Sequence, residues 1–384
     1  MKKLFLALMV MALAIGIVSP AQAAPPLVFN TWVHTSQGLV PNYPTGWAFV
    51  FPPDFKSDRH GVAFVGTSSQ GDTSGLFQSS DSGITWNGTA QLNATWSLSI
   101  SPNYATDHLM AAGTASAGVW KTTNSWATPT DITGALPDSA VSVVAFSPNY
   151  AIDHQLFAAT RSKGVFMTVN LGTTWAHIGP GGTPDDSRIT AMGFTPDYAA
   201  NHTLFIAASA EGSGLSGIFK GVWNLVGSDI HWTWTRLVSG LTDLDLRVLV
   251  ISPNYANDLT LYAGTYGGGL FKSSNSGSSW SFVDGTESLY VQALAISPDY
   301  AYDRSVYMGE DGSGVYRYVD LATDPYVTQM NAGFPDAVHG GSITSLAFAP
   351  GLPRILFAGV LGGSDGGVWQ FLFPIQQYLP LVRK

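Results

Sequence analysis

The segment ISPNYATD, residues 100–107, decides the fold, because close copies of it recur along the whole chain. Each copy joins the end of a short apolar run to a proline and then to a polar turn. The copies are FPPDFKSD (51–58), ISPNYATD (100–107), FSPNYAID (146–153), FTPDYAAN (194–201), ISPNYAND (251–258), ISPDYAYD (296–303) and FAPGLPRI (348–355). The shared prolines lie 45 to 57 residues apart, so the chain consists of seven similar units.

Each unit contains four short segments that have the pattern of β-strands. In the third unit the first three are SVVAFSP (142–148), LFAAT (156–160) and GVFMT (164–168), and Trp175 opens the fourth. These runs are bounded by Pro and Gly and are too short for helices, which indicates buried strands. Four strands in a repeat of this length are typical of one blade of a β-propeller. The predicted fold class is all-β: a single seven-bladed β-propeller of four-stranded blades.

The seventh unit lacks a fourth strand of its own, because only a short tail follows Phe373. Near the other end of the chain, TWVHTSQGL (31–39) has the same frame as TWTRLVSGL (233–241), which holds the fourth strand of unit four. We therefore expect residues 28–36 to complete blade seven, so that the mature N-terminal strand closes the ring. Closure removes exposed sheet edges, which otherwise promote aggregation.

The two ends of the chain are predicted to lie outside the propeller. Residues 1–23 combine two lysines, an apolar core and a small-residue site ending in Ala-Gln-Ala, which is the pattern of a secretory signal peptide. The propeller then spans residues 24–373, and residues 374–384 form an apolar and then basic C-terminal tail. We expect a secreted or cell-surface protein of bacterial type, with no integral membrane segment after signal cleavage.

The composition excludes some functions. A formal net charge of −9 argues against nucleic acid as a partner, because such binding depends on Lys and Arg that neutralise phosphates. The chain contains no cysteine, so its stability depends on packing and not on disulfides.

A second motif follows the third strand in several units. SSDSGITW (79–86) has the form Ser-x-Asp-x-Gly-x-Thr-Trp, and TVNLGTTW (168–175) and SSNSGSSW (273–280) are partial copies; units two, four and six have lost most of it. With this motif the chain resembles the Asp-box (BNR) repeat β-propellers. That group includes sialidases, xyloglucan-cleaving hydrolases, sortilin-type receptors and photosystem II assembly factors, so the resemblance implies the fold and leaves the activity open.

The motif has either a structural or a catalytic role. An Asp side chain can accept hydrogen bonds from nearby backbone N–H groups, Gly supplies a positive φ, and Trp packs between elements. Asn can replace Asp in such a turn but not as a catalytic carboxylate, so the two Asn copies favour the structural role. The predicted turn residues are Asp81, Gly83 and Trp86, Asn170, Gly172 and Trp175, and Asn275, Gly277 and Trp280.

Candidate binding residues are found where one unit departs from the others. Six residues before each shared proline lie Trp47, Trp96, Ser142, Thr190, Arg247, Gln292 and Thr344, which should surround the channel mouth. The two Trp and the Arg could stack on a sugar or hold an acidic group. Alternatively, these side chains fill the channel and pair with acids such as Asp243 and Asp245.

Two further positions stand out on the same predicted rim. Glu310 interrupts a column of Thr and Ser residues at the end of the second strand and is followed by Asp311. This pair could perform acid–base chemistry or hold a cation, or it could simply form a hairpin turn. The predicted binding set is Trp47, Trp96, Arg247, Tyr290 and Glu310.

No catalytic residue, metal site or cofactor is assigned. His108, His154 and His202 occupy one column of the repeat and therefore lie on separate blades, too far apart to share a metal. We interpret the protein as an exported, non-catalytic propeller, expected to be a monomer, that presents one rim to a protein or glycan ligand. The alternative is a glycoside hydrolase of the sialidase or xyloglucanase-like type, but no Arg-Ile-Pro segment occurs and no carboxylate pair can be identified.

Overall fold

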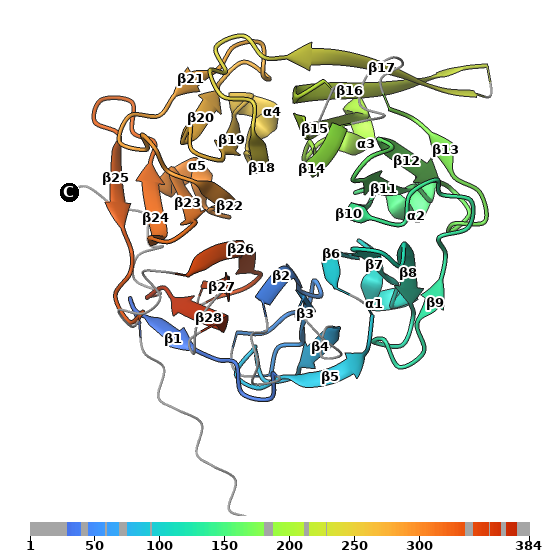
Figure 1. Cartoon of the computed structure of the whole chain (residues 1–384), viewed down its shortest axis with the longest axis horizontal. Helices are drawn as coiled ribbons and strands as arrows, with labels where there is room; N and C mark the ends of the chain where they lie inside the picture. Colours follow the sequence, from blue (N-terminus) through green and yellow to red (C-terminus); the bar gives the residue numbers. More distant parts are fainter. Residues whose placement is uncertain are drawn as a thin grey trace, which may run out of the picture.

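Seven four-stranded antiparallel sheets stand in a ring around a central axis (Figure 1). The structure, a computed structural model, describes residues 29–39, 45–57, 60–68, 75–92, 94–179, 187–210, 215–227, 229–334, 341–352, 354–361 and 366–374. The predicted seven-bladed β-propeller is confirmed. The predicted signal peptide and, apart from its first residue, the C-terminal tail lie outside the described residues.

The strands follow one another from the channel to the outside of each blade. Blade one contains β2 (Thr45–Val50), β3 (Ala63–Ser68), β4 (Leu76–Ser79) and β5 (Asn87–Ala90), and blade two contains β6 (Thr95–Ile100), β7 (Met110–Thr114), β8 (Val119–Thr122) and β9 (Thr130–Asp131). Blade three contains β10 (Val141–Phe146), β11 (Leu156–Thr160), β12 (Val165–Thr168) and β13 (Ala176–His177), and blade four contains β14 (Ser187–Phe194), β15 (Thr203–Ala210), β16 (Gly217–Val226) and β17 (Asp229–Leu237). Blade five contains β18 (Leu246–Ile251), β19 (Leu261–Thr265), β20 (Leu270–Ser273) and β21 (Ser281–Phe282), and blade six contains β22 (Val291–Ile296), β23 (Ser305–Glu310), β24 (Gly314–Val319) and β25 (Tyr326–Gln329). Blade seven contains β26 (Ser342–Ala349), β27 (Ile355–Leu361), β28 (Gly367–Leu372) and β1 (Trp32–His34).

The hydrophobic core lies between blades and not within them. Seven clusters of buried side chains each draw on two neighbouring blades. In β7, for example, Met110 and Ala112 pack toward blade one while Ala111 packs toward blade three. Because successive side chains of a strand point to opposite faces, a strand buried on both faces reads as a continuous apolar run. This explains why the second strands lack the polar alternation of a half-buried strand.

The chain ends close the ring as predicted. β1 pairs antiparallel with β28, with Trp32 opposite Phe371 and His34 opposite Trp369. Trp32 is 2% exposed, stacks on Phe334 of blade six at a centroid distance of 4.8 Å, and donates its indole N–H to the Met330 carbonyl at 2.6 Å. The N-terminal strand therefore completes blade seven and also joins it to blade six.

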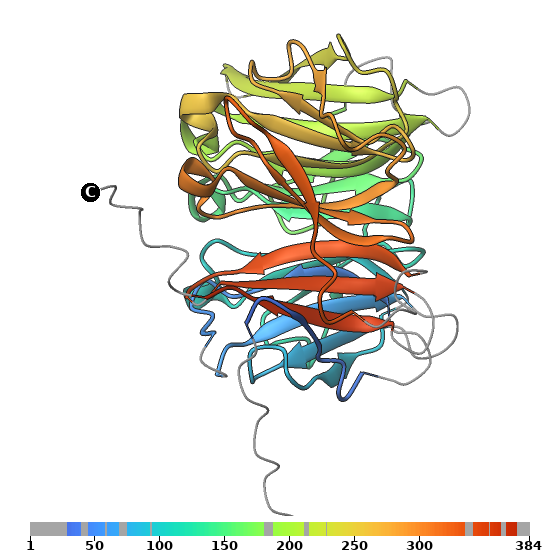
Figure 2. The same ribbon diagram turned by 90° about the vertical axis from the view of Figure 1, so that its left-hand side faces the viewer.

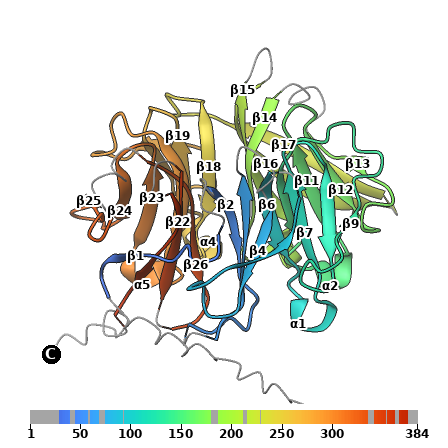
Figure 3. The ribbon, with the colours of Figure 1, turned by 60° about the horizontal axis from the view of Figure 1, so that its bottom comes forward.

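The polar turns after the shared prolines are single helical turns, which the sequence-based prediction of plain turns missed. The described residues contain α1 (Tyr104–Asp107), α2 (Tyr150–Asp153), α3 (Tyr198–Asn201), α4 (Tyr255–Asp258) and α5 (Tyr300–Asp303). In blade two, Asp107 accepts from the Ser101 hydroxyl at 2.6 Å and from the Leu109 N–H at 2.9 Å. Side views show these helical turns on one face of the ring (Figures 2 and 3). None of the helices formed by described residues has the length and apolar character needed to cross a membrane.

We predict that deleting residues 24–37 lowers the melting temperature markedly, because the deletion removes β1, uncovers Phe371 and Trp369, and exposes the edge of β28. Thermal melting followed by circular dichroism measures the effect. Closure by β1 is wrong if the shortened protein melts at the temperature of the parent.

Candidate functional site

One residue in the inner strand of every blade forms a β-bulge at the same position. The strand register shifts between the residues that flank Trp47, Trp96, Ser142, Thr190, Arg247, Gln292 and Thr344. These are the seven residues that lie six before the shared prolines. A bulge leaves its extra residue out of the ladder and changes the direction of a side chain. The repeat therefore presents one variable side chain per blade at the same level of the channel.

A cavity of about 660 Å³ occupies this part of the channel. Six of the seven bulge residues line it: Trp96, Ser142, Thr190, Arg247, Gln292 and Thr344. The side chain of the seventh, Trp47, lies outside the described residues. A cavity of this size falls within the range of small-ligand sites.

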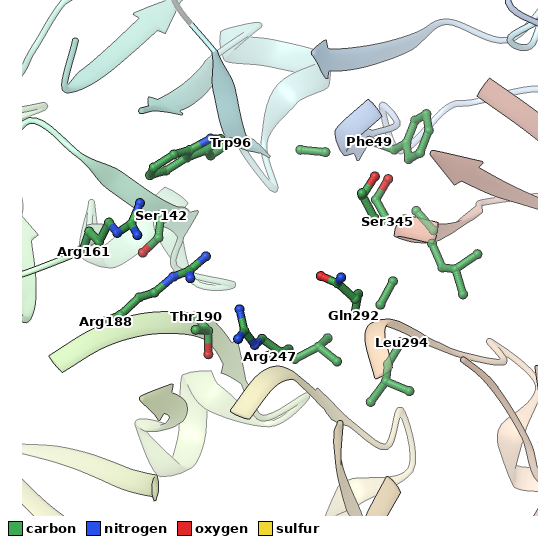
Figure 4. Close-up of a pocket in the computed structure, with 16 residues that line it drawn as sticks. Phe49, Trp96, Ser142, Arg161, Arg188, Thr190, Arg247, Gln292, Leu294 and Ser345 are labelled. Atoms are coloured by element: carbon green, nitrogen blue, oxygen red, sulfur yellow. The ribbon is translucent and has the colours of Figure 1, made fainter. Parts of the chain in front are cut away.

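The cavity has a cationic side, and the side opposite to it is lined by apolar and uncharged polar residues. Arg161, Arg188 and Arg247 come from blades three, four and five, and Trp96 lies beside them (Figure 4). The Arg161 guanidinium lies 5.9 Å from the centre of the Trp96 ring. The apolar residues of the opposite side come from blades one, six and seven and include Phe49 and Leu294.

The small bulge residues bond within the protein. Ser142 donates to the carbonyl oxygens of Ala159 and Ile189, and Thr344 donates to the Gly359 carbonyl at 3.1 Å. Thr190 donates to the Ala207 carbonyl at 3.3 Å. These hydroxyls bind carbonyl groups beside the bulges, so the larger bulge residues are the ones that reach further into the cavity.

Arg247 belongs to a polar and aromatic cluster on blades five and six. It forms an ion pair with Asp245 at 2.9 Å, and its guanidinium carbon lies 4.5 Å from the centre of the Tyr266 ring. Tyr266 donates to Asp311 at 3.2 Å, and this hydrogen bond raises the pKa of the Tyr266 hydroxyl. Gln292 also donates to Asp311, at 3.0 Å. Arg247 therefore pairs with Asp245, one of the two acids named in the alternative that the bulge residues pair within the protein.

The predicted binding residues of blade six have different environments. Tyr290 is 41% exposed and packs edge-on against Tyr266, with ring centres 4.7 Å apart. Glu310 is only 5% exposed; it accepts from the Ser313 hydroxyl and from the Tyr290 N–H. Glu310 thus makes its hydrogen bonds within its own blade. Thr265, at the equivalent position of blade five, does the same when its hydroxyl donates to the Gly269 carbonyl. Glu310 lies inside the blade. The side chain of Asp311, and not that of Glu310, belongs to the polar and aromatic cluster on blades five and six.

Two columns of the repeat predict the remaining site residues. The position after the second-strand Thr or Ser holds Arg161, Tyr266 and Asp311, and the position two before the bulge holds Arg188, Asp245 and Tyr290. The two columns meet in space through backbone hydrogen bonds. The N–H of Arg161 donates to the carbonyl of Ala140, which lies two residues before the Ser142 bulge, and the N–H groups of Tyr266 and Asp311 donate to the carbonyls of Asp245 and Tyr290. The sequence analysis did not predict Tyr266 as a site residue, although it follows Thr265 just as Arg161 follows Thr160.

The Asp81 motif forms a hydrogen-bonded turn. Asp81 accepts from the Thr85 N–H at 2.8 Å, the Thr85 hydroxyl at 2.6 Å and the Ser79 hydroxyl at 2.7 Å. Gly83 has φ +83°, where an added Cβ would lie 2.4 Å from Phe357. Trp86 is buried and donates to the Thr35 carbonyl at 2.9 Å.

The two Asn copies keep the bond from the backbone and reverse the direction of the bond to the hydroxyl. The amide oxygens of Asn170 and Asn275 each accept from the backbone N–H four residues on, at 2.9 Å. Their amide nitrogens donate to the hydroxyls of Thr174 and Ser279. Gly172 and Gly277 have φ +84° and +82°, and Trp175 and Trp280 donate to carbonyls of the preceding blade.

Blade two retains this turn, although its sequence was interpreted as having lost most of the motif. The Asn124 amide oxygen accepts from the Thr128 N–H at 3.1 Å, and Trp126 takes the place of the glycine with φ +69°. Its ring is fully buried against blades one and two. The hydrogen bonds of the turn therefore survive when the sequence pattern has become weak.

The three histidines of one column each end a helical turn, with φ of 50–53°. They lie on blades two, three and four. Within the described part of the chain, no group of three or more His, Asp or Glu side chains could hold a metal ion.

Comparisons with known proteins identify the fold. No family model and no curated protein matches the sequence. A solved structure of YCF48 bound to D1 peptide matches with a TM-score of 0.61 at 15% identity, over 91% of this chain and 99% of that chain. The WD40 repeats of RRP9 match with a TM-score of 0.61 at 16% identity, over 90% and 98%. A GH74 enzyme of Niastella koreensis matches with a TM-score of 0.58 at 16% identity, over 84% of this chain but only 52% of that chain. At such identities the likeness shows the β-propeller fold alone.

We predict that Asp81→Asn costs little stability, because Asn170 and Asn275 already make the equivalent bonds, whereas Asp81→Ala costs about 1–2 kcal/mol through lost hydrogen bonds. Urea unfolding at neutral pH compares the two variants. The reverse order of stability would contradict the structural role of the turn.

The same turn should respond to pH. Burial raises the pKa of Asp81, but hydrogen bonds from Thr85, Ser79 and Ile84 outweigh it, so the pKa is lowered from the usual 3.8. Because the folded-state pKa is the lower one, the ionised carboxylate stabilises the fold above pH 3.8, and this stabilisation is lost as pH falls further. The advantage of the parent over Asp81→Ala should therefore shrink in acid, while Asp81→Asn loses this part of the pH dependence. A constant difference between parent and Asp81→Ala from neutral pH to pH 3 would refute this assignment.

Proposed function

We propose that this protein is a non-catalytic binding module whose channel mouth receives an acidic segment of a partner protein. The observation that supports the proposal best is the cavity that Arg161, Arg188, Arg247 and Trp96 line on one side. The protein as a whole carries a net charge of −9, so these cations are concentrated at one place on an acidic molecule. Such a local field orients an acidic partner toward the mouth during encounter.

The chemistry of these side chains fits carboxylates. An Arg guanidinium presents a planar set of donors that can bind a carboxylate with two parallel hydrogen bonds. The Arg247 side chain keeps 24% of its surface exposed while one of its terminal nitrogens pairs with Asp245, so the guanidinium is still accessible to a ligand. Trp96 adds a large, rigid apolar surface, and Trp and Arg are the residues that most often dominate binding energy at interfaces.

Glycoside hydrolysis is supported less well. A glycosidase needs two carboxyl groups on either side of the scissile bond. Among the described residues that line the cavity, none is Asp or Glu. The rim carboxylates are already engaged, since Asp245 accepts from Arg247 and Ser209, and Asp311 accepts from Gln292 and Tyr266.

A protein ligand is also favoured by the fold comparison. YCF48, one of the matching propellers, has been solved with a peptide bound to it. A glycan ligand is the second candidate, because the exposed rings of Tyr266 and Tyr290 offer a surface on which a sugar could stack. We further propose that the protein is exported, on the pattern of residues 1–23, and that it belongs with the Asp-box propellers, on the turn at Asp81.

We predict that the mature protein binds acidic peptides through the mouth. Fluorescence anisotropy with a labelled peptide library compares acidic sequences with their Glu→Gln and Asp→Asn counterparts. The double variant Trp96→Ala, Arg247→Ala should weaken binding to the best acidic peptide at least tenfold, which corresponds to about 1.4 kcal/mol. Binding should also weaken as salt rises, because ions screen exposed charges.

Tyr302→Ala is the matched control, because Tyr302 is 88% exposed on α5, on the face that carries the helical turns. It should leave the affinity unchanged. Equal affinity for acidic and neutralised peptides would reject an acidic partner. Binding of β-glucan or sialylated oligosaccharides in place of peptides would support the glycan ligand, and steady hydrolysis of them would support the enzyme.

A further inference from the structure

The outermost strand of blade four differs from those of the other blades. In six blades this strand has two to four residues, as in β13, β21 and β25. In blade four, β17 has nine residues and pairs with β16 along its whole length, from Ile218 opposite Leu237 to Val226 opposite Asp229. Very short edge strands are one way in which proteins prevent edge-to-edge pairing. Blade four lacks this protection.

The free edge of β17 faces outward. β17 is the last strand of its sheet, and Figure 1 shows it at the periphery of the ring, with no element of the described residues outside it. Beyond the pairing of Thr203 with Val222, the β16–β17 hairpin continues past β15 as a two-stranded ribbon. A strand in this position presents unpaired backbone N–H and C=O groups to another chain.

Packing within the protein explains why β17 carries Trp232 and Trp234 on one face. It does not explain why the outer edge of so long a strand is left open. Trp234 donates its indole N–H to the Ile178 carbonyl of blade three at 2.6 Å, and Trp232 packs edge-on against Phe157. These alternate residues of β17 attach the ribbon to blade three. On the other face, His231, Thr233 and Thr235 are exposed. Both faces are accounted for, while from Ile230 to Arg236 no described residue outside β16 hydrogen-bonds to the backbone of β17.

We propose that β17 pairs antiparallel with β17 of a second copy of this chain, about a two-fold axis through Thr233. In this register Thr233 faces Thr233 of the other copy, and Trp232 faces Trp234. His231 faces Thr235, and Ile230 faces Arg236. Partners in an antiparallel ladder point to the same face, so the two Trp-bearing faces join into one and the polar faces join into the other.

We choose a second copy of this chain as the partner, and not an unrelated strand, because β17 is compatible with itself in this register. No like charges lie opposite one another in this register, and a two-fold pairing uses the same surface on both subunits. The sequence analysis predicted a monomer and gave no role to the outermost strands of the blades. The length of β17 changes that expectation, and the dimer would present two channel mouths on one particle.

The absence of cysteine from the chain allows a direct test of symmetry and register. Across the proposed axis, the Cα atoms of the two Thr233 residues would lie about 4.5–5.5 Å apart, within reach of a disulfide. The purified mature Thr233→Cys variant should therefore form a covalent dimer under mild oxidation. Thr235→Cys should not, because its counterpart lies four residues further along the strand, about 13 Å away. Thr328→Cys, on the exposed outer strand β25 of blade six, controls for random collisions.

Charge at the axis supplies the second test. Thr233→Lys and Thr233→Glu each place two like charges opposite one another, so each variant alone should dimerise at least tenfold more weakly than the parent in analytical ultracentrifugation. An equimolar mixture should recover the dimer, because Lys then faces Glu. Thr328→Lys should dimerise like the parent.

The outcomes separate cleanly. A parent dimer that both variants weaken and the mixture restores, with cross-linking only at position 233, supports the proposal. A monomeric parent overturns it, including a monomer that binds an extended peptide at β17. A parent dimer that Thr233→Lys leaves intact, or equal cross-linking at positions 233, 235 and 328, also overturns it.

Discussion

Every blade of this protein depends on its neighbours, because the apolar side chains of each sheet are buried between blades. The seven core clusters each span two blades, so a single blade would expose both of its faces to water. The same type of hydrogen bond is found at most of the junctions between blades. The indole N–H of Trp32, Trp86, Trp175, Trp234 and Trp280 donates to a carbonyl at the outer end of the preceding blade. Trp thus fills the space between two blades and satisfies a backbone carbonyl there.

Where this bond is missing, the junctions are built differently. Between blades five and six, Asp320 accepts from Lys272 at 2.7 Å, from Tyr300 at 2.6 Å and from Tyr262 at 2.8 Å. Burial opposes ionisation of this carboxyl, but the hydrogen bonds outweigh it and lower the pKa of Asp320. Between blades one and two, Trp126 fills the space as a fully buried ring. A rigid ring with several kinds of junction holds the inner strands in place around the channel.

The inner strands of this rigid ring line the cavity in the channel. A bulge at the same position of each blade takes one side chain out of the ladder, so its identity can vary with little effect on the sheet. Three of these positions hold Ser or Thr residues that bond to nearby carbonyls, whereas Trp96 and Arg247 extend the surface of the cavity. Arg161 and Arg188 join them from adjacent columns of the repeat. The cationic side of the cavity is therefore assembled from four blades, and its described residues lie in the strands or directly after them.

The repeat in the sequence determined the number of blades, the closing strand and the ring of bulge residues, because each of these is a pattern of spacing that every blade must share. Two kinds of feature were decided only by tertiary structure. Glu310 and Asp311 are adjacent in sequence, but the pleat of the strand turns one carboxylate into the blade and the other toward Tyr266. Trp232 and Trp234 of β17 likewise pack against blade three, a contact between residues more than fifty positions apart in the chain. The spacing of the repeat in the sequence reveals the features that all blades share. The contacts that distinguish one blade from another form only when the ring brings distant residues together.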